Sequence, residues 1–364
     1  MTHVIMTQSV MTPLDNGNKT FQRSPLTNLA TRYDNHCPQK PNEGMMIAGK
    51  ELFLILFSVM LLHSLKPAVA LDDDEPHYHL VEIIPSDANM PVPEQEEPGR
   101  RLSTQGHVHF YVMGDTPYLV REIERFPYQL AALESRADFM VHVGDMKKRR
   151  MDCLESEYQV IASMLREAPC PTFIVPGDND WFECADSQGA YSIWQESLGL
   201  LDEHWTRKSF EVRHQPERPE NFAFTHNNVH VIGLHIVHAS FNVEPMLYQI
   251  GEDALRWFRN ELVHMAEAKA VVIFAHAYPF HPKYNDFLRA LQDTVQLMYN
   301  KPFLYVQGEH HNFQVDNPIE FSSNFVRVVV DKGGIADPLE VVCDTNSEIP
   351  FKLKRRPLSG FSTQ

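Results

Sequence analysis

Three apolar stretches of this chain end in the same way, and this repetition constrains the fold more than any other feature. Each closes with Gly-Asp: VHFYVMGD at 108–115, FMVHVGD at 139–145 and TFIVPGD at 172–178. One such stretch is weak evidence, because aspartate is common in turns and helix caps. Three of them, roughly 30 residues apart, have the spacing of consecutive strand-helix-strand units. The pattern predicts parallel strands that deliver three aspartates to the sheet edge where open α/β sheets bind ligands.

The segments between and after these stretches predict alternating helices and strands. Apolar residues recur at helical spacing over 118–134 and 154–165, and a third helix is expected near 191–198. Residues 203–221 are polar and are predicted to form a loop. The remaining order is strands 222–225 and 229–237, helix 253–267, strand 270–275, helix 285–298, and strands 302–306, 325–330 and 339–342. This alternation predicts an α/β fold with a parallel sheet.

The first 105 residues differ in composition from the rest. Residues 1–44 are polar without an apolar period, which is typical of a disordered extension. The alternative is a gene-model artefact, with the true start at Met45 or Met46. Residues 45–70 contain an apolar run of 11 residues followed by Ala68-Val69-Ala70, the pattern of a cleaved signal peptide. The run is short of the roughly 20 residues of a transmembrane helix, so a single-pass signal anchor is the alternative. Residues 71–105 are acidic, contain several prolines and are predicted to be a linker.

The sequence therefore predicts one domain over 106–345 and a frayed basic tail over 346–364, in a secreted or secretory-pathway luminal protein. In an oxidising compartment the four cysteines after the signal segment can pair in three ways; they are Cys153, Cys170, Cys184 and Cys343. Cys153 with Cys184 is favoured, because each lies shortly beyond an aspartate loop of the same predicted site. Free buried thiols are the alternative. The net charge of −16 argues against a nucleic-acid surface, and membrane contact is expected only if the signal segment is retained.

Side chains that can bind metal gather at the predicted strand ends. They are Asp115, Asp145, Asp178 with Asn179 and Asp180, His276, and Glu309 with His311. This is too many ligands for one tetrahedral ion, but it suits two ions that share a carboxylate and together promote displacement at phosphorus. Oxygen ligands mixed with imidazole favour Mn, Fe or Zn, so the cofactor expected is two divalent or trivalent metal ions. His142 is assigned to packing, and the strand histidines His230, His235 and His238 are expected to pack or face solvent.

The order of motifs GD, GD, GDND, H and G-x-x-H, over roughly Gly106 to Cys343, resembles that of the calcineurin-like metallophosphoesterase superfamily. The variants GDTPY, HVGDMK and PGDNDWFEC resemble a divergent branch rather than the calcineurin-type or purple acid phosphatases. The resemblance implies a four-layer α/β/β/α sandwich of two mixed β-sheets. It also implies that Asp115 and His311 bind the first metal ion and that Asp145 bridges both ions.

The same resemblance assigns His276 to the second ion. Asp178 stands where the family usually has a ligand Asn, and Glu309 stands where it has a further ligand His. The family's D-x-H motif is Asp115-Thr116-Pro117 here, so one His ligand is missing, and Tyr118 either replaces it as a phenolate or packs.

Asn179 occupies the place of the family's His that contacts phosphate and protonates the leaving group. An amide cannot act as a general acid at neutral pH. The remaining candidates for that acid are Asp180 and the loop residue His281. The basic run that begins at Lys147 is either a solvated face or a phosphate contact, with Lys147 as the candidate for metal or substrate.

The expected function is thus hydrolysis of a small phosphomonoester or phosphodiester, with a metal-bound hydroxide of the two-ion centre attacking phosphorus. The alternative is a non-catalytic metal- or phosphate-binding protein on the same fold. Asn179 favours the alternative. The strand-end carboxylates favour the enzyme, because buried charges without a role are costly to fold around.

Overall fold

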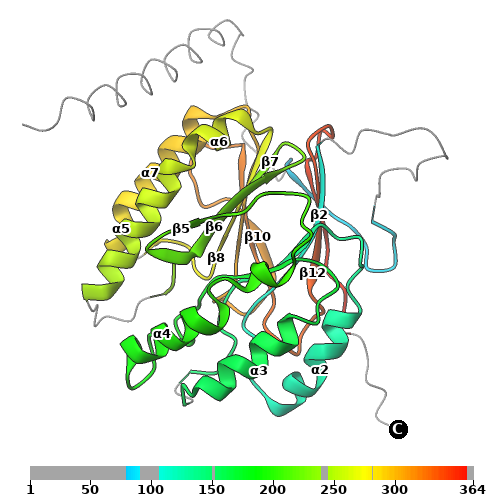
Figure 1. Ribbon diagram of the computed structural model, residues 1–364. Coiled ribbons are helices and arrows are strands. Elements are labelled where there is room, and N and C mark those ends of the chain that lie inside the picture. Colours follow the sequence, from blue (N-terminus) through cyan, green and yellow to red (C-terminus); the bar gives the residue numbers. More distant parts are fainter. Residues whose placement is uncertain (1–78, 91–105, 150–151, 239–244, 281, 359–364) are drawn as a thin grey trace, which may run out of the picture. The chain divides into compact units, whose positions relative to one another are not determined.

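A computed structural model describes residues 79–90, 106–149, 152–238, 245–280 and 282–358 of the chain (Figure 1). The expected extension 1–44 and signal segment 45–70 lie outside the described residues, as does His281. None of the helices in the described ranges is both long and apolar enough to span a membrane.

The strands form two mixed sheets. The six-stranded sheet has the order β1 (Val81–Ile83), β13 (Phe351–Lys354), β12 (Leu339–Asp344), β2 (His107–Met113), β3 (Phe139–His142) and β4 (Thr172–Ile174). The seven-stranded sheet has the order β10 (Gln314–Asp316), β11 (Phe325–Val329), β9 (Phe303–Gln307), β8 (Ala270–Ala275), β7 (Val229–Leu234), β6 (Arg218–His226) and β5 (Arg213–Gln215). Within them β2, β3 and β4 are parallel, as are β7, β8, β9 and β11.

Alternating side chains of the central strands explain why the sheets stack. On β2, Val108, Phe110 and Val112 face the core between the two sheets, whereas Tyr111 and Met113 pack with the helices outside. Strand β8 alternates in the same way between the inter-sheet core and the opposite helical layer. A strand covered on both faces is apolar throughout, which is why these segments read as continuous apolar runs.

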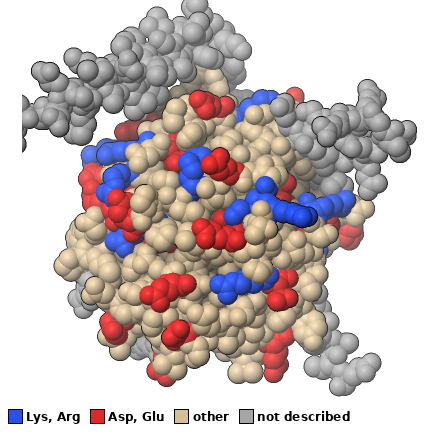
Figure 2. Space-filling model, in the orientation of Figure 1, with Lys and Arg blue, Asp and Glu red and all other residues tan. Residues whose placement is uncertain are grey.

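Helices cover the outer face of each sheet (Figure 1). Helices α2 (Val120–Ala131), α3 (Glu155–Leu165) and α4 (Ser187–Leu198), with the short 3₁₀ helix η1 (Leu201–His204), lie on the first sheet. Helices α5 (Pro245–Asn260), α6 (Leu262–Glu267) and α7 (Asn285–Leu297) lie on the second, beside η2 (Pro282–Tyr284). The four-layer α/β/β/α sandwich expected from the sequence is therefore confirmed. On the face shown in Figure 2, acidic and basic side chains are interspersed with uncharged ones.

Several elements differ from the sequence predictions. The segment 203–221 is not all loop, because β5 and the start of β6 lie in it. The helix predicted over 253–267 begins earlier and is interrupted at Glu261, whose buried carboxylate accepts a hydrogen bond from Arg213 at 2.6 Å. The expected linker contains β1. The expected tail contains β13, so the prediction of a frayed tail was wrong for Phe351–Lys354. The two strands pair with each other across most of the chain, a contact that local patterns do not show, and β13 also pairs with the nearby β12.

The predicted crosslink between Cys153 and Cys184 is present, with the Cα atoms 6.0 Å apart. It joins the segment after β3 to the segment after β4. Cys170 and Cys343 are buried free thiols.

Candidate metal centre

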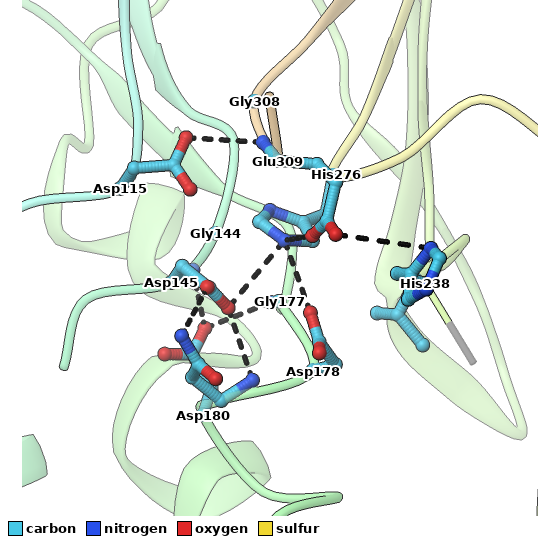
Figure 3. Close-up of polar contacts among 12 residues, drawn as sticks. Asp115, Gly144, Asp145, Gly177, Asp178, Asp180, His238, His276, Gly308 and Glu309 are labelled. Carbon is cyan, nitrogen blue, oxygen red and sulfur yellow. Dashed lines mark hydrogen bonds and ion pairs between the residues drawn. The ribbon is translucent and has the colours of Figure 1, made fainter. Parts of the chain in front are cut away.

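The side chains singled out at the strand ends come together at one edge of the two sheets. Asp115, Asp145 and Asp178 follow the parallel strands β2, β3 and β4 of the first sheet. His276 follows β8 of the second sheet, and Glu309 with His311 follows its parallel neighbour β9. The carboxyl ends of parallel strands are where such sheets bind ligands, and here two sheets contribute to the same place (Figure 3).

The backbone at this edge is strained and closely packed. Asp115, Asp145, Glu309 and His311 all have positive φ angles, of 52°, 57°, 67° and 65°. Residues other than glycine rarely adopt positive φ angles, and those that do cluster at functional sites. Gly144 has φ of 87°, and a Cβ atom there would lie 2.4 Å from the backbone nitrogen of Gly177. Glycine is therefore required for the Asp145 loop to approach the Asp178 loop.

Three carboxylates converge on one ring nitrogen of His276. The Nε2 atom lies 3.0 Å from Glu309 Oε2, 3.2 Å from Asp178 Oδ1 and 3.5 Å from Asp145 Oδ1 (Figure 3). The other nitrogen, Nδ1, lies 2.8 Å from the backbone carbonyl of Val143. A carbonyl only accepts, so Nδ1 carries a hydrogen and donates it. This arrangement leaves Nε2 directed at the carboxylates, as in ligand histidines fixed by a partner behind the ring.

Three carboxylates share one imidazole in this group. Burial of His276 opposes its protonation, but the carboxylates around it outweigh burial and raise its pKa well above the usual value. Burial also raises the pKa of Asp145 well above its usual value, despite the opposing effect of His276. Even a protonated Nε2 offers one hydrogen to three carboxylates, and the buried Asp178 Oδ1 has no well-formed hydrogen bond despite its distance to Nε2.

A metal ion fits this group. Asp145, Asp178, His276 and Glu309 can each offer a ligand atom, and all four atoms lie within 4.8 Å of one another. Oxygen and imidazole nitrogen are the donors that Mn, Fe and Zn accept. A cation would satisfy the orphaned Asp178 oxygen and compensate the excess negative charge. Burial raises the pKa of Glu309, but contact with His276 outweighs it and lowers that pKa to about 2, so the carboxylate is charged and available.

The Asp115 side of the centre is organised differently. Asp115 is fully buried, and its Oδ2 accepts a hydrogen bond from the backbone N–H of Glu309 at 3.1 Å. Its Oδ1 lies 3.3 Å from His311 Nε2 and accepts from the Tyr118 hydroxyl at 3.2 Å. The same hydroxyl lies 2.9 Å from Asp145 Oδ2, so its single proton is shared between the two aspartates. Burial, and then the charges of these two aspartates, raise the pKa of Tyr118.

The GDND loop supports the Asp145 carboxylate. Asn179 donates from its backbone N–H to Asp145 Oδ1 at 3.0 Å and from its amide to Oδ2 at 2.5 Å. Asp180 is fully buried, and its two oxygens accept from the backbone N–H groups of Asp145, Met146 and Gly177 at 2.8–2.9 Å. Burial raises the pKa of Asp180 to about 6, against the lowering effect of those hydrogen bonds. Asp180 thus fastens the Asp145 loop to the Asp178 loop.

Two further histidines near these loops behave differently. His142 is buried, as expected, and lies 2.8 Å from the Thr116 carbonyl through Nε2, while its Nδ1 accepts from the Gly144 N–H at 3.2 Å. His238 was expected to pack or face solvent, and its side chain is 60% exposed; its Nδ1 also lies 3.7 Å from Glu309 Oε1 (Figure 3). Strand β7 is parallel to β8, so the strand-end rule used for His276 would have found His238 as well.

Lys147 does not stand free on a solvated face. Its side chain is buried, and its charge acts to lower the pKa of Asp180. Two residues further on, Arg149 pairs with Glu183 at 2.7 Å, from the segment after the GDND loop. Lys148 and Arg149 are exposed, and Arg149 contacts the segment after that loop through Glu183.

Comparisons with known proteins show structural similarity at low identity. No protein-family model matches the sequence, and no curated protein matches it significantly. A 5′-nucleotidase from Candida albicans is similar over 68% of this chain and 50% of its own, with a TM-score of 0.43 and 13% identity. A purple acid phosphatase from yellow lupin seeds is similar over 69% of this chain and 54% of its own, with a TM-score of 0.39 and 11% identity.

The anchor protein GAP50 of the inner membrane complex of Plasmodium is similar over 71% of this chain and 90% of its own, with a TM-score of 0.39 and 10% identity. This chain spans about half the length of the nucleotidase and of the lupin phosphatase. The chain's own architecture is two mixed sheets between helical layers, with acidic and histidine side chains at their shared edge.

Proposed function

We propose that this chain is a metal-dependent phosphoester hydrolase that acts on small phosphomonoesters or phosphodiesters. The observation that carries the proposal is the convergence of Asp145, Asp178 and Glu309 on His276 Nε2, where strands from both sheets end. The reaction class comes from the resemblance of the strand-end motifs to metallophosphoesterases. The same resemblance adds a second ion on the Asp115 side, with Asp145 between the two.

Each side chain has its own task in this proposal. Asp145, Asp178, His276 and Glu309 would hold one ion, and Asp115 with His311 would serve the other. When bound, such ions supply an activated water and neutralise charge on the phosphoryl oxygens. The Val143 carbonyl keeps His276 in the tautomer that presents Nε2. Asp180 is a positioning residue, because its oxygens hold the two aspartate loops together.

Protonation of the leaving group is the step for which the chain is least equipped. The Asn179 amide donates to Asp145 and has no proton to give up at neutral pH. Asp180 was the second candidate, and both of its oxygens already accept backbone hydrogen bonds. His281 remains the proposed acid. If protonation is weak, the rate of hydrolysis will depend steeply on the acidity of the leaving group, so aryl esters will react far faster than alkyl esters.

The second candidate function is recognition of metal or phosphate without catalysis. The observation that favours it is Asn179, which stands where the metallophosphoesterase resemblance expects the proton-donating histidine. Such a protein would bind the ion and phosphate yet turn over no ester.

One experiment separates the two functions. The full chain is stripped with a chelator, reloaded with Mn²⁺ or Zn²⁺, and assayed for metal content and for hydrolysis of chromogenic aryl phosphomonoesters and phosphodiesters. His276→Ala should lose both metal and hydrolysis, whereas His204→Ala, an exposed histidine of η1, should lose neither. Wild-type protein that holds metal and hydrolyses no ester would support the binding function. Wild-type protein that holds no metal would refute the metal-dependent hydrolase and the recognition of metal.

We further propose that the protein works outside the cell or in the secretory pathway, on a small phosphate ester rather than on nucleic acid. The Cys153–Cys184 disulfide supports this location, because such crosslinks persist in oxidising compartments. Membrane attachment would require that the segment 45–70 is retained.

A further inference from the structure

The two ion positions that the motif resemblance implies are unequal in this structure. On the His276 side, four ligand atoms lie within 4.8 Å of one another. Among the described residues, no second group of three or more His, Cys, Asp or Glu side chains meets that condition, so Asp115 and His311 do not close up with Asp145. The first position is assembled, and the second is not.

Tyr118 lies where the second position would be. Its hydroxyl is within hydrogen-bonding distance of Asp115 Oδ1, at 3.2 Å, and of Asp145 Oδ2, at 2.9 Å. Its backbone N–H donates to the Glu122 carboxylate at 2.6 Å, which holds the residue against the start of α2. The ring packs edge-on against His311, with centroids 6.0 Å apart.

The carboxylates on this side are already supplied with donors from the chain. Asp115 receives the Glu309 N–H on Oδ2, and Asp145 receives the Asn179 amide on Oδ2. The single proton of the Tyr118 hydroxyl is shared between Asp115 Oδ1 and Asp145 Oδ2. By contrast, the Asp178 Oδ1 atom on the other side has no well-formed partner. A cation is therefore needed on the His276 side, whereas on the Asp115 side it would have to compete with these hydrogen bonds.

We propose that this chain holds one resident metal ion, bound by Asp145, Asp178, His276 and Glu309, and that the Tyr118 hydroxyl takes the place of a second ion between Asp115 and Asp145. This inference rests on the proposed metal-dependent function and narrows it. A second ion must displace hydrogen bonds to charged carboxylates, which are stronger than neutral ones, so it should bind at least about tenfold more weakly than the first.

The number of resident ions is tested by counting metal in the full chain. After reloading with Mn²⁺ and dialysis, elemental analysis should find one ion per chain. Glu309→Gln should lose most of that ion, whereas His311→Ala, whose side chain is 40% exposed, should keep it. Two ions of equal affinity in the wild type, or loss of metal in His311→Ala, would overturn the inference and leave the proposed hydrolase intact. A wild-type chain without any ion would overturn the proposed function as well.

The role of Tyr118 is tested by calorimetric titration of Tyr118→Phe with Mn²⁺, beside Tyr299→Phe as the control, because Tyr299 is 56% exposed and follows α7. Phenylalanine keeps the ring and removes the donor, so the resident ion should stay and a second ion should bind about tenfold more tightly than in wild type. The control should match wild type. Loss of the resident ion, weaker binding of the second ion, or unchanged binding would each overturn the role assigned to the hydroxyl.

Discussion

Replacing Asp145 with asparagine should have opposite effects on stability and on metal binding. In the metal-free protein Asp145 is buried beside Asp115, Asp178 and Asp180, and its pKa is raised well above the usual value because burial disfavours its charge. A carboxyl group with a raised folded-state pKa contributes stability below its unfolded pKa and loses it as the pH rises through the folded pKa. Neutral pH lies well above the unfolded pKa, where the buried acid is unfavourable compared with a neutral side chain, so Asp145→Asn should stabilise the metal-free chain.

The surroundings of Asp145 show how the variant can be accommodated. Oδ1 accepts the Asn179 backbone N–H, so the retained carbonyl oxygen will occupy that position. The new amide nitrogen then takes the Oδ2 position, where the Tyr118 hydroxyl can rotate to accept and the Asn179 amide can flip. With the shape kept, removal of the buried charge should raise the free energy of unfolding by about 1–3 kcal/mol in the metal-free state, since an imperfectly paired buried ion costs several kcal/mol.

The effect on metal binding has the opposite sign. Substitutions that merely disturb the orientation of a ligand weaken metal binding by about 10- to 100-fold, so loss of an anionic ligand should cost at least about 100-fold. The hydrolysis rate should fall by about 100-fold or more, because several kcal/mol of transition-state stabilisation go with the ion.

The assay is thermal unfolding of wild type and Asp145→Asn, each with chelator and with excess Mn²⁺, together with metal analysis and hydrolysis of a chromogenic phosphodiester. Asp180→Asn is the control: it also removes one buried negative charge, but the residue lies outside the ligand group and its oxygens bond only to backbone N–H groups. Asp180→Asn should therefore destabilise the fold, and it should change the metal content much less than Asp145→Asn does. An Asp145→Asn protein that binds and hydrolyses like wild type would refute the metal-centre hypothesis. One that is less stable than wild type in chelator would refute the electrostatic reasoning.

Three further predictions concern other parts of the chain. Burial lowers the pKa of His142 to about 4, so the free energy of unfolding should fall as the pH drops from about 6.5 to about 4. His142→Asn should remove up to about 3 kcal/mol of that fall. Urea unfolding at several pH values measures it, and a pH dependence equal to that of wild type would contradict the prediction. Replacing Cys153 and Cys184 with serine should lower the free energy of unfolding by about 3 kcal/mol. Non-reducing peptide maps that show both residues as free thiols would refute the disulfide. The mature protein should begin near Leu71, and N-terminal sequencing that finds a start before Lys50 would favour an anchor.

The centre could be predicted from the sequence to the extent that it depends on local patterns. Asp145 and Asp178 each follow an apolar run, and the rule that parallel strands end at a common edge brings them together without any tertiary information. His276 follows a strand of the other sheet, so its place beside them was implied only by the resemblance of the motifs. The same rule applied to β7 reaches His238, which was set aside only because strand histidines usually pack. The α/β class followed from the alternation of strands and helices, whereas the arrangement in two mixed sheets was implied by the resemblance of the motifs.

What could not be predicted depends on contacts between distant segments. Strands β1 and β13 are short and polar in part, and only their pairing with each other and with β12 makes them strands. The interruption at Glu261 reflects a buried ion pair with Arg213, from a segment that reads as loop. The hydrogen bonds of Tyr118 and Asp180 arise because the loops meet in space, and residue type alone left several roles open for both.

The pairing of β2 with β12 also constrains when the protein can fold during synthesis. The first long strand of the domain has β3 as one neighbour, but on its other side it must wait for Leu339–Asp344, and β12 in turn pairs with β13. The ribosome therefore has to release nearly the whole domain before the first sheet can close, and until then β2 has an unpaired apolar edge that is prone to aggregation. Pairings of such sequence separation also make folding slow. We expect the nascent chain to depend on chaperones until β12 and β13 emerge, and a chain truncated before Leu339 to be insoluble rather than partly active.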